Sequence, residues 1–150
     1  MTRWRTRHRG SHAERGAAAV EFAIVLVVLL LIIFAIIDFG RLLFVSQSMK
    51  AASREGARAG VVASTPAPTG ATVYGAADNA GASAAALAGG TLVVSVNGVP
   101  VQSSSTGVAL CGGAQLTVTA ATDFRWFTPV GIFSSNVNSV SADTTMRCES

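Results

Sequence analysis

The chain begins with polar and basic positions, continues into a long apolar run, and then changes to shorter mixed patterns. Residues 22–37 are apolar throughout, without a charge, a glycine or a proline. A helix over these residues alone is about 24 Å long, which is short of a hydrocarbon core of roughly 30 Å. Including the flanking residues closes that gap. The pattern therefore predicts a transmembrane helix over residues 17–45.

The apolar run is followed by a segment with helical periodicity, which predicts that the helix continues outside the membrane over residues 46–64. Within it, Ala52, Gly56 and Gly60 recur every four residues and form a stripe of small side chains. Such a stripe lets another helix approach closely. The alternative is a frayed helix end at which glycine does no harm. Basic residues form a second stripe with the same spacing: Lys50, Arg54 and Arg58.

A stretch rich in proline and threonine stops this helix, so we expect a separate small domain over residues 65–150. The domain starts with an alanine-rich segment that predicts a second helix over residues 74–88. Asp78, or a residue just before it, is the expected N-cap. Gly89 and Gly90 are expected to end the helix.

From residue 91 the apolar positions alternate with a period of two, which predicts an antiparallel sheet. Asn97-Gly98 is a strong hairpin signal between the first two strands. The expected strands cover residues 91–96, 99–103, 115–122 and 138–146. The fold class is therefore α+β, with a long N-terminal membrane-spanning helix that continues into an exported helix and then a small, pilin-like antiparallel-sheet domain.

Two aromatic and apolar segments, at residues 124–127 and 132–133, are joined by a Pro129–Gly131 turn. In a small domain such side chains usually belong to the core, so we expect them to cover one face of the sheet. The alternative is an exposed contact patch.

The formal net charge of +3 is distributed unevenly, because residues 1–16 contain five arginines and one acidic residue. A basic segment before an apolar helix is expected to stay on the cytoplasmic side, which places the C-terminal domain outside the cytoplasm. Nucleic-acid binding is the alternative for an arginine-rich leader, and we expect no such partner. A cleaved signal peptide fits poorly, because the apolar run exceeds the usual 7–15 residues or so.

The sequence offers few groups for catalysis. Both histidines, His8 and His12, belong to the leader, whereas Cys111 and Cys148 follow the predicted membrane helix. A bilayer between the two pairs prevents an intramolecular zinc site and leaves the exported part without a histidine general base. We therefore expect no enzyme, metal or cofactor. In an oxidising compartment the cysteines are expected to form a disulfide, and two unpaired buried thiols are the alternative.

Three motifs along residues 15–62 resemble the TadE-like family, the pseudopilins of the tight-adherence (Tad/Flp) pilus assembly system. The first is Arg15-Gly16-Ala-Ala-Ala-Val-Glu21-Phe22, which precedes the apolar run. The second is Asp38-Phe39-Gly40-Arg41, in which the acid and the arginine are three residues apart and can pair. The third is Arg54-Glu55-Gly56-Ala57-Arg58.

The resemblance implies that a membrane prepilin peptidase cuts after Gly16, so that Ala17 becomes the mature N-terminus. Glu21 would then neutralise the Ala17 ammonium of a neighbouring subunit. The implied function is that of a minor pilin-like subunit that helps to assemble, initiate or anchor a pilus in the bacterial cytoplasmic membrane. Its implied partners are the peptidase and other membrane proteins of the system, contacted through the N-terminal helix. The alternative is a single-pass membrane protein with an extracytoplasmic ligand- or partner-binding domain.

Overall fold

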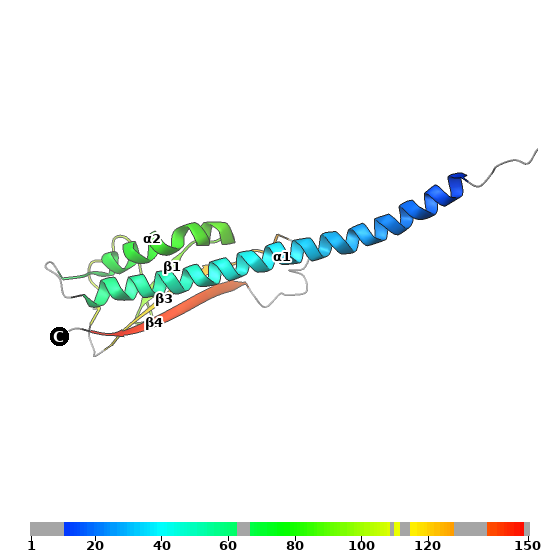
Figure 1. The fold of residues 1–150 in the computed structure, drawn as a ribbon. Coiled ribbons are helices and arrows are strands. Elements are labelled where there is room, and N and C mark those ends of the chain that lie inside the picture. Colours follow the sequence, from blue (N-terminus) through cyan, green and yellow to red (C-terminus); the bar gives the residue numbers. More distant parts are fainter. Residues whose placement is uncertain (1–10, 63–66, 109, 112–114, 128–137, 149–150) are drawn as a thin grey trace, which may run out of the picture. The chain divides into compact units, whose positions relative to one another are not determined.

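The computed structural model describes residues 11–62, 67–108, 110–111, 115–127 and 138–148 of the chain. In this part of the chain two helices precede four strands, as Figure 1 shows. The chain separates into two compact units, residues 1–37 and residues 38–150. The two units are described separately below.

Helix α1 runs without interruption from Ser11 to Val61, which confirms that one helix covers the apolar run and most of the segment predicted to extend it. It begins earlier than predicted and includes the end of the segment assigned to the leader. A run of alanines directly follows Gly16, and alanine has the highest helix propensity of all residues. This propensity favours continuing the helix through the glycine.

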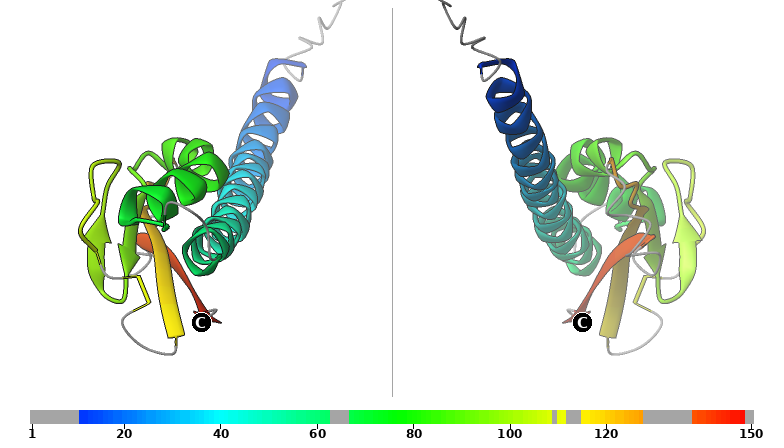
Figure 2. Two further views of the ribbon diagram at one scale, coloured as in Figure 1. Left: turned by 90° about the vertical axis from the view of Figure 1, so that its left-hand side faces the viewer. Right: turned by 90° about the vertical axis from the view of Figure 1, so that its right-hand side faces the viewer.

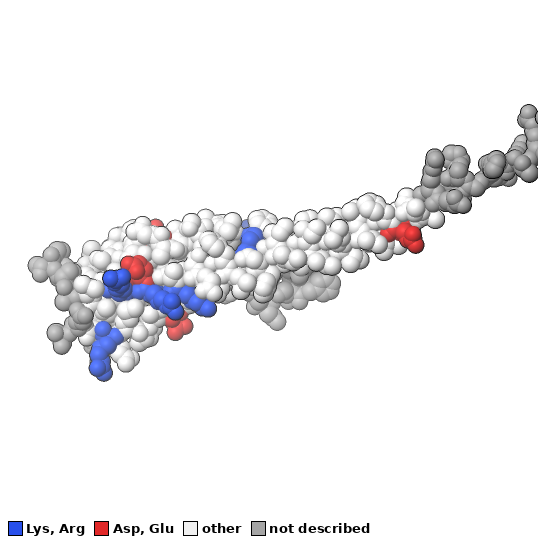
Figure 3. Space-filling view, in the orientation of Figure 1, with Lys and Arg blue, Asp and Glu red and all other residues white. Residues whose placement is uncertain are grey.

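The first unit contains the part of α1 that is suited to a membrane. Its described side chains from residue 16 to residue 37 are exposed, apart from a half-buried Ala35. In the space-filling view this part of α1 shows a continuous uncharged surface beyond one acidic position (Figure 3). Among the described residues α1 is the one helix that is long and apolar enough to cross a membrane.

Helix α2 covers Gly70–Ala88 and starts earlier than the sequence predicted. Its N-cap is Thr69, whose side-chain oxygen accepts a hydrogen bond from the backbone N–H of Thr72 while the Thr72 hydroxyl bonds back to the cap. The expected cap at Asp78 is therefore wrong, since that residue lies inside the helix. Gly89 ends α2 in a left-handed conformation, as predicted.

The sheet contains four antiparallel strands in the order β2-β1-β3-β4. Strand β1 is Val93–Val96, β2 is Val99–Val101, β3 is Gln115–Asp123 and β4 is Ser139–Arg147. Each predicted strand is present, with ends that differ by a few residues. Asn97 and Gly98 both have positive φ, at 50° and 82°, as a two-residue hairpin turn requires.

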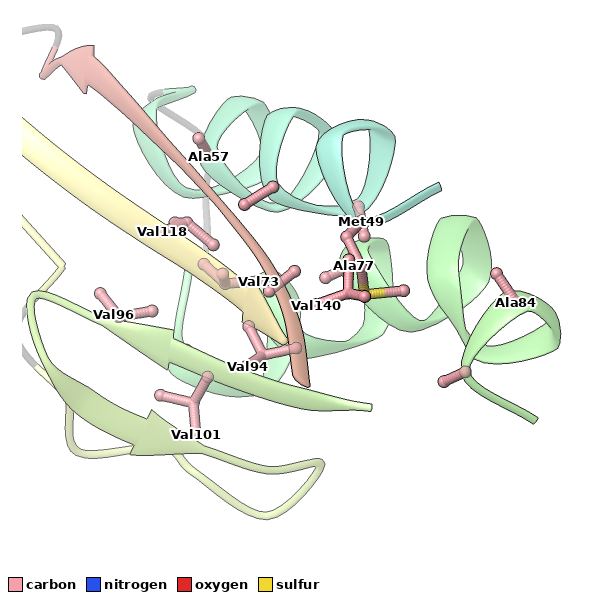
Figure 4. Packing of buried hydrophobic residues seen from close by; sticks show 14 of the residues in the cluster. Met49, Ala57, Val73, Ala77, Ala84, Val94, Val96, Val101, Val118 and Val140 are labelled. Carbon is pink, nitrogen blue, oxygen red and sulfur yellow. The ribbon is translucent and has the colours of Figure 1, made fainter. Parts of the chain in front are cut away.

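Helices α1 and α2 pack against one face of the sheet (Figure 2). Alternation along β3 explains why this face is apolar, because Leu116, Val118 and Ala120 are buried between more exposed threonines. Figure 4 shows the core that results, in which Met49 of α1 lies beside Ala77 of α2. The α+β fold class is thereby confirmed.

The aromatic segment after β3 divides between core and surface. Phe124 is buried, as predicted, and Trp126 packs edge-on against it with the ring centroids 5.1 Å apart. Phe127 is 76% exposed, so the predicted core position is wrong for this residue. The predicted segment 132–133 and its turn lie outside the described residues.

Cys111 and Cys148 form a disulfide, as the sequence predicted. The bond joins the segment before β3 to the end of β4. The disulfide therefore lies at one end of the β3–β4 pair. Asp123 and Ser139 pair at the other end, where the aromatic segment begins.

Candidate functional site

The residues of the predicted cleavage site lie within α1. Gly16 and Ala17 are exposed and helical, five and six residues after the first residue of α1. A Cβ added to Gly16 has no neighbour within 4 Å. Packing therefore does not require a glycine here, although glycine costs about 1 kcal/mol relative to alanine inside a helix. A peptidase that takes an extended substrate has to unwind this turn first.

Glu21 and Phe22 follow one turn later and are also exposed, with Phe22 at 66%. In the described part of the chain no hydrogen bond or ion pair involves Glu21. The structure of the single chain thus leaves this carboxylate available to a group on another molecule.

Buried contacts along α1 begin at Asp38, whose side chain is 1% exposed. Its carboxylate Oδ1 accepts a hydrogen bond from Arg41 Nη1 at 3.2 Å, so the predicted pair is present. The same oxygen accepts from the backbone N–H of Phe127 at 3.4 Å. Asp38 therefore joins α1 to the segment after β3.

Arg41 extends this network to α2. Its Nη2 donates to the carbonyl oxygen of Leu87 at 2.6 Å, and its Nη1 is 3.4 Å from the carbonyl oxygen of Arg125. Leu87 is in the last turn of α2, where carbonyl groups lack partners within the helix. The guanidinium also lies over the Phe127 ring, with 3.8 Å between Cζ and the ring centroid. We call Asp38, Arg41, Leu87, Arg125 and Phe127 the Asp38–Arg41 junction.

The stripe of small residues on α1 is occupied by other elements of the same chain. A Cβ on Gly56 would lie 3.2 Å from Val118 of β3 and 3.3 Å from the Cβ of Ala77 in α2. Across the same interface, a Cβ on Gly81 of α2 would lie 2.9 Å from the Cβ of Ala52. The predicted close approach of another helix is therefore confirmed, and that helix is α2.

The other motif residues lie on the uncovered side of α1. Phe39 and Gly40 are exposed, and so are Arg54, Glu55 and Arg58. Among the described residues these charged groups form no ion pair with one another or with the sheet. The third motif therefore combines one buried glycine, Gly56, with solvent-facing charges.

A pocket of about 330 Å³ is lined by Tyr74 of α2 and by residues in and around strands β1 and β2. Uncharged side chains line it, and Tyr74 and Gln102 supply an aromatic ring and an amide. Its size is at the lower limit for small-molecule sites.

Sequence reasoning missed several groups that complete these contacts. The carbonyl groups that bind Arg41 have no side-chain signature, so no pattern identifies them. Thr69 had a partial signal, because threonine is a preferred N-cap residue, although Thr72 occupies the position where a capping box usually has Glu or Gln. The Ser53 and Thr144 hydroxyls, 2.9 Å apart, join α1 to β4 and were also not predicted.

Comparison with known proteins agrees with the resemblance found in the motifs. The model of the family described as TadE-like protein matches residues 16–58. No curated protein and no solved structure shows significant similarity to the chain. The matched segment begins at the glycine of the predicted cleavage site and ends at the last arginine of the third motif. Over residues 16–58 the chain is thus confirmed as similar to the TadE-like family.

Proposed function

We propose that this chain is a minor pilin-like subunit that assists the assembly, initiation or anchoring of a Tad/Flp-type pilus. The observation that supports this most is the family match, which covers the cleavage site, the apolar helix and both later motifs in one continuous segment. The role is structural and involves no catalysis. Its partners are a prepilin peptidase and other membrane proteins of the pilus system.

In this proposal the basic leader stays in the cytoplasm, α1 crosses the cytoplasmic membrane once, and the sheet domain lies outside. The exposed apolar surface of residues 16–37 supports the span. The arginines before Gly16 support the orientation, because positive flanks remain cytoplasmic.

Cleavage after Gly16 creates an ammonium group on Ala17, close to an apolar environment. An unpaired charge there costs several kcal/mol or more, so a neighbouring carboxylate stabilises it. Glu21 is exposed and has no partner among the described residues. We assign it to the ammonium of an adjacent subunit, a contact that sets the axial register between two helices.

The experiment is co-expression of the full chain with its cognate prepilin peptidase, followed by intact-mass measurement. We expect a product that begins at Ala17, and we expect Gly16→Val to remain full length. The matched control is Gly40→Val, which changes another exposed glycine of α1 with no neighbour within 4 Å of its Cβ. A stable full-length wild type beside an active peptidase contradicts the proposal.

One observation favours a second candidate, a single-pass membrane protein whose outer domain binds a ligand. It is the pocket beside Tyr74 and Gln102. The same cleavage experiment separates the two candidates, because this second function requires no processing after Gly16.

A further inference from the structure

Large apolar side chains from three separate elements are exposed at one end of the sheet domain, the end at which Asp38 lies. Phe39, Leu43 and Phe44 come from α1, Leu87 from α2, and Phe127 from the segment after β3. Each is at least 46% exposed. We call these five residues the collar.

Contacts of the Asp38–Arg41 junction hold the collar together. Arg41 donates a hydrogen bond to the carbonyl oxygen of Leu87, and its Cζ is 3.8 Å from the centroid of the Phe127 ring. The backbone N–H of Arg125 also donates to the carbonyl of Ala88 at 2.9 Å. Leu87 and Phe127 are therefore fixed beside the same turn of α1, although 40 positions separate them in the sequence.

The collar surrounds this turn of α1. Asp38 and Arg41 point towards the domain, and side chains on a helix rotate by about 100° per residue. Phe39 and Leu43 consequently point away from the domain, while Leu87 and Phe127 cover the inner side. Among the described residues, exposed apolar side chains therefore lie on both the outer and the inner side of this turn.

The same helix continues directly from this turn into the apolar run of residues 22–37. Aromatic side chains close to basic groups are typical of the membrane–water interface. The exposed side chain of Arg125 supplies such a basic group beside Phe127. The collar thus has the composition of an interfacial segment at the place where a bilayer boundary is expected.

We propose that the collar rests in the headgroup region of the lipid bilayer, so that the sheet domain is seated on the membrane through Leu87 and Phe127 as well as through α1. This inference depends on the membrane span of the proposed function. It adds that the sheet domain contacts lipid directly, in addition to being connected to the membrane through α1.

This placement in the headgroup region is also compatible with the two charged residues of the second motif, Asp38 and Arg41. A carboxylate and a guanidinium at a bilayer boundary lose hydration. Asp38 and Arg41 neutralise each other, and the Phe127 ring lies between the guanidinium and the outside. A cation held over an aromatic face is attracted to it more strongly when both groups are desolvated.

Fluorescence quenching by brominated lipids tests the proposal on the full chain in vesicles of phosphatidylcholine and phosphatidylglycerol. The native tryptophans are first replaced by Trp4→Phe and Trp126→Phe, and a single new tryptophan is then introduced. Phe127→Trp and Leu87→Trp are the two probes of the collar. Val99→Trp, an exposed position on β2 beside the hairpin turn, is the control at the other end of the domain. Leu30→Trp reports on the span itself.

We expect lipids brominated near the headgroups to remove most of the emission from Phe127→Trp and Leu87→Trp and none from Val99→Trp. Leu30→Trp is expected to lose most emission with lipids brominated near the bilayer midplane. Disulfide formation, measured by alkylation, shows that each variant has folded. If Leu30→Trp is quenched and both collar probes are not, the collar faces water or a protein partner and the inference is overturned. If Leu30→Trp is not quenched, the membrane span of the proposed function fails instead.

Discussion

Gly60 of α1 and Leu116 of β3 approach so closely that no side chain fits between them. A Cβ on Gly60 would lie 2.5 Å from Cδ2 of Leu116 and 2.9 Å from Cγ2 of Val73. Leu116 and Val73 are both fully buried, so neither has free space to move into. The glycine is therefore a packing requirement of the helix–sheet interface.

We predict that Gly60→Ala lowers the free energy of unfolding. The added Cβ overpacks the interface, which costs about 1–3 kcal/mol. Replacing glycine by alanine within a helix gains only about 1 kcal/mol, so the net effect is expected to be destabilising. Gly40→Ala is the matched control, because its Cβ meets nothing within 4 Å. It is expected to leave stability unchanged or to raise it by up to about 1 kcal/mol. Denaturant unfolding in detergent, followed by Trp126 fluorescence, measures both, and equal effects of the two changes would contradict the close packing.

The Asp38–Arg41 pair gives a second prediction. Arg41→Met removes the guanidinium that pairs with the buried carboxylate of Asp38 and leaves the Leu87 carbonyl without this donor. Removing one member of a buried ion pair typically costs about 3–5 kcal/mol. Arg54→Met, on the exposed side of α1, is the control and should change stability by less than about 0.5 kcal/mol.

A double-mutant cycle on the same pair separates the ion pair from simple loss of packing. Asp38→Leu combined with Arg41→Met removes both charges, so the double variant is expected to be more stable than the sum of the single losses predicts. Additive losses would show that Asp38 and Arg41 act independently.

The disulfide gives a third prediction. Cys111 and Cys148 are 37 residues apart, and closing a loop of this length stabilises the folded state by about 4 kcal/mol in the chain-entropy model. Reduction, or Cys111→Ser combined with Cys148→Ser, is expected to lower the free energy of unfolding by about this amount. The change is measured as a lower midpoint of unfolding. Reductant should have no further effect on the double variant, and an unchanged midpoint on reducing the wild type would show that the bond does not support the fold.

The fourth prediction concerns Glu21. Glu21→Ala makes the membrane segment more apolar, so membrane integration and cleavage after Gly16 are expected to continue. Piliation is expected to fail, because the Ala17 ammonium of a neighbour loses its counter-charge. Cleavage is read by intact mass, integration by membrane fractionation, and piliation by electron microscopy. Glu55→Ala changes another exposed acid of α1 and serves as the control. Normal piliation of Glu21→Ala would show that this carboxylate is only tolerated at the interface.

Local patterns predicted the elements of this fold because their signals lie within a few residues. Alternation identified β3, since Leu116 and Val118 face the core while Thr117 and Thr119 do not. Asn97-Gly98 predicted the hairpin because few other residue pairs adopt positive φ twice. The N-cap of α2 was misplaced, because the alanine-rich pattern indicated a later helix start than Thr69, where the observed cap lies.

Long-range partners were harder to predict than the elements themselves. The spacing of Ala52, Gly56 and Gly60 identified a face for close approach, but periodicity does not reveal what occupies a face. Its occupants are α2 and β3 of the same chain. Likewise, the spacing of Asp38 and Arg41 predicted their pairing, whereas the Leu87 and Arg125 carbonyls were unpredictable because every residue has a carbonyl group.

The contact between α1 and the sheet domain over residues 38–61 also determines how the protein responds to mechanical load. Tension applied to the membrane end of α1 acts along the helix axis and reaches the domain first at Asp38. From there to Gly60, hydrogen bonds between α1 and other elements act together with close glycine contacts to resist sliding. Contacts loaded in parallel share the force, whereas contacts pulled open one after another fail singly. Within residues 38–150, α1 and the sheet are therefore expected to move together under a pull along the helix axis.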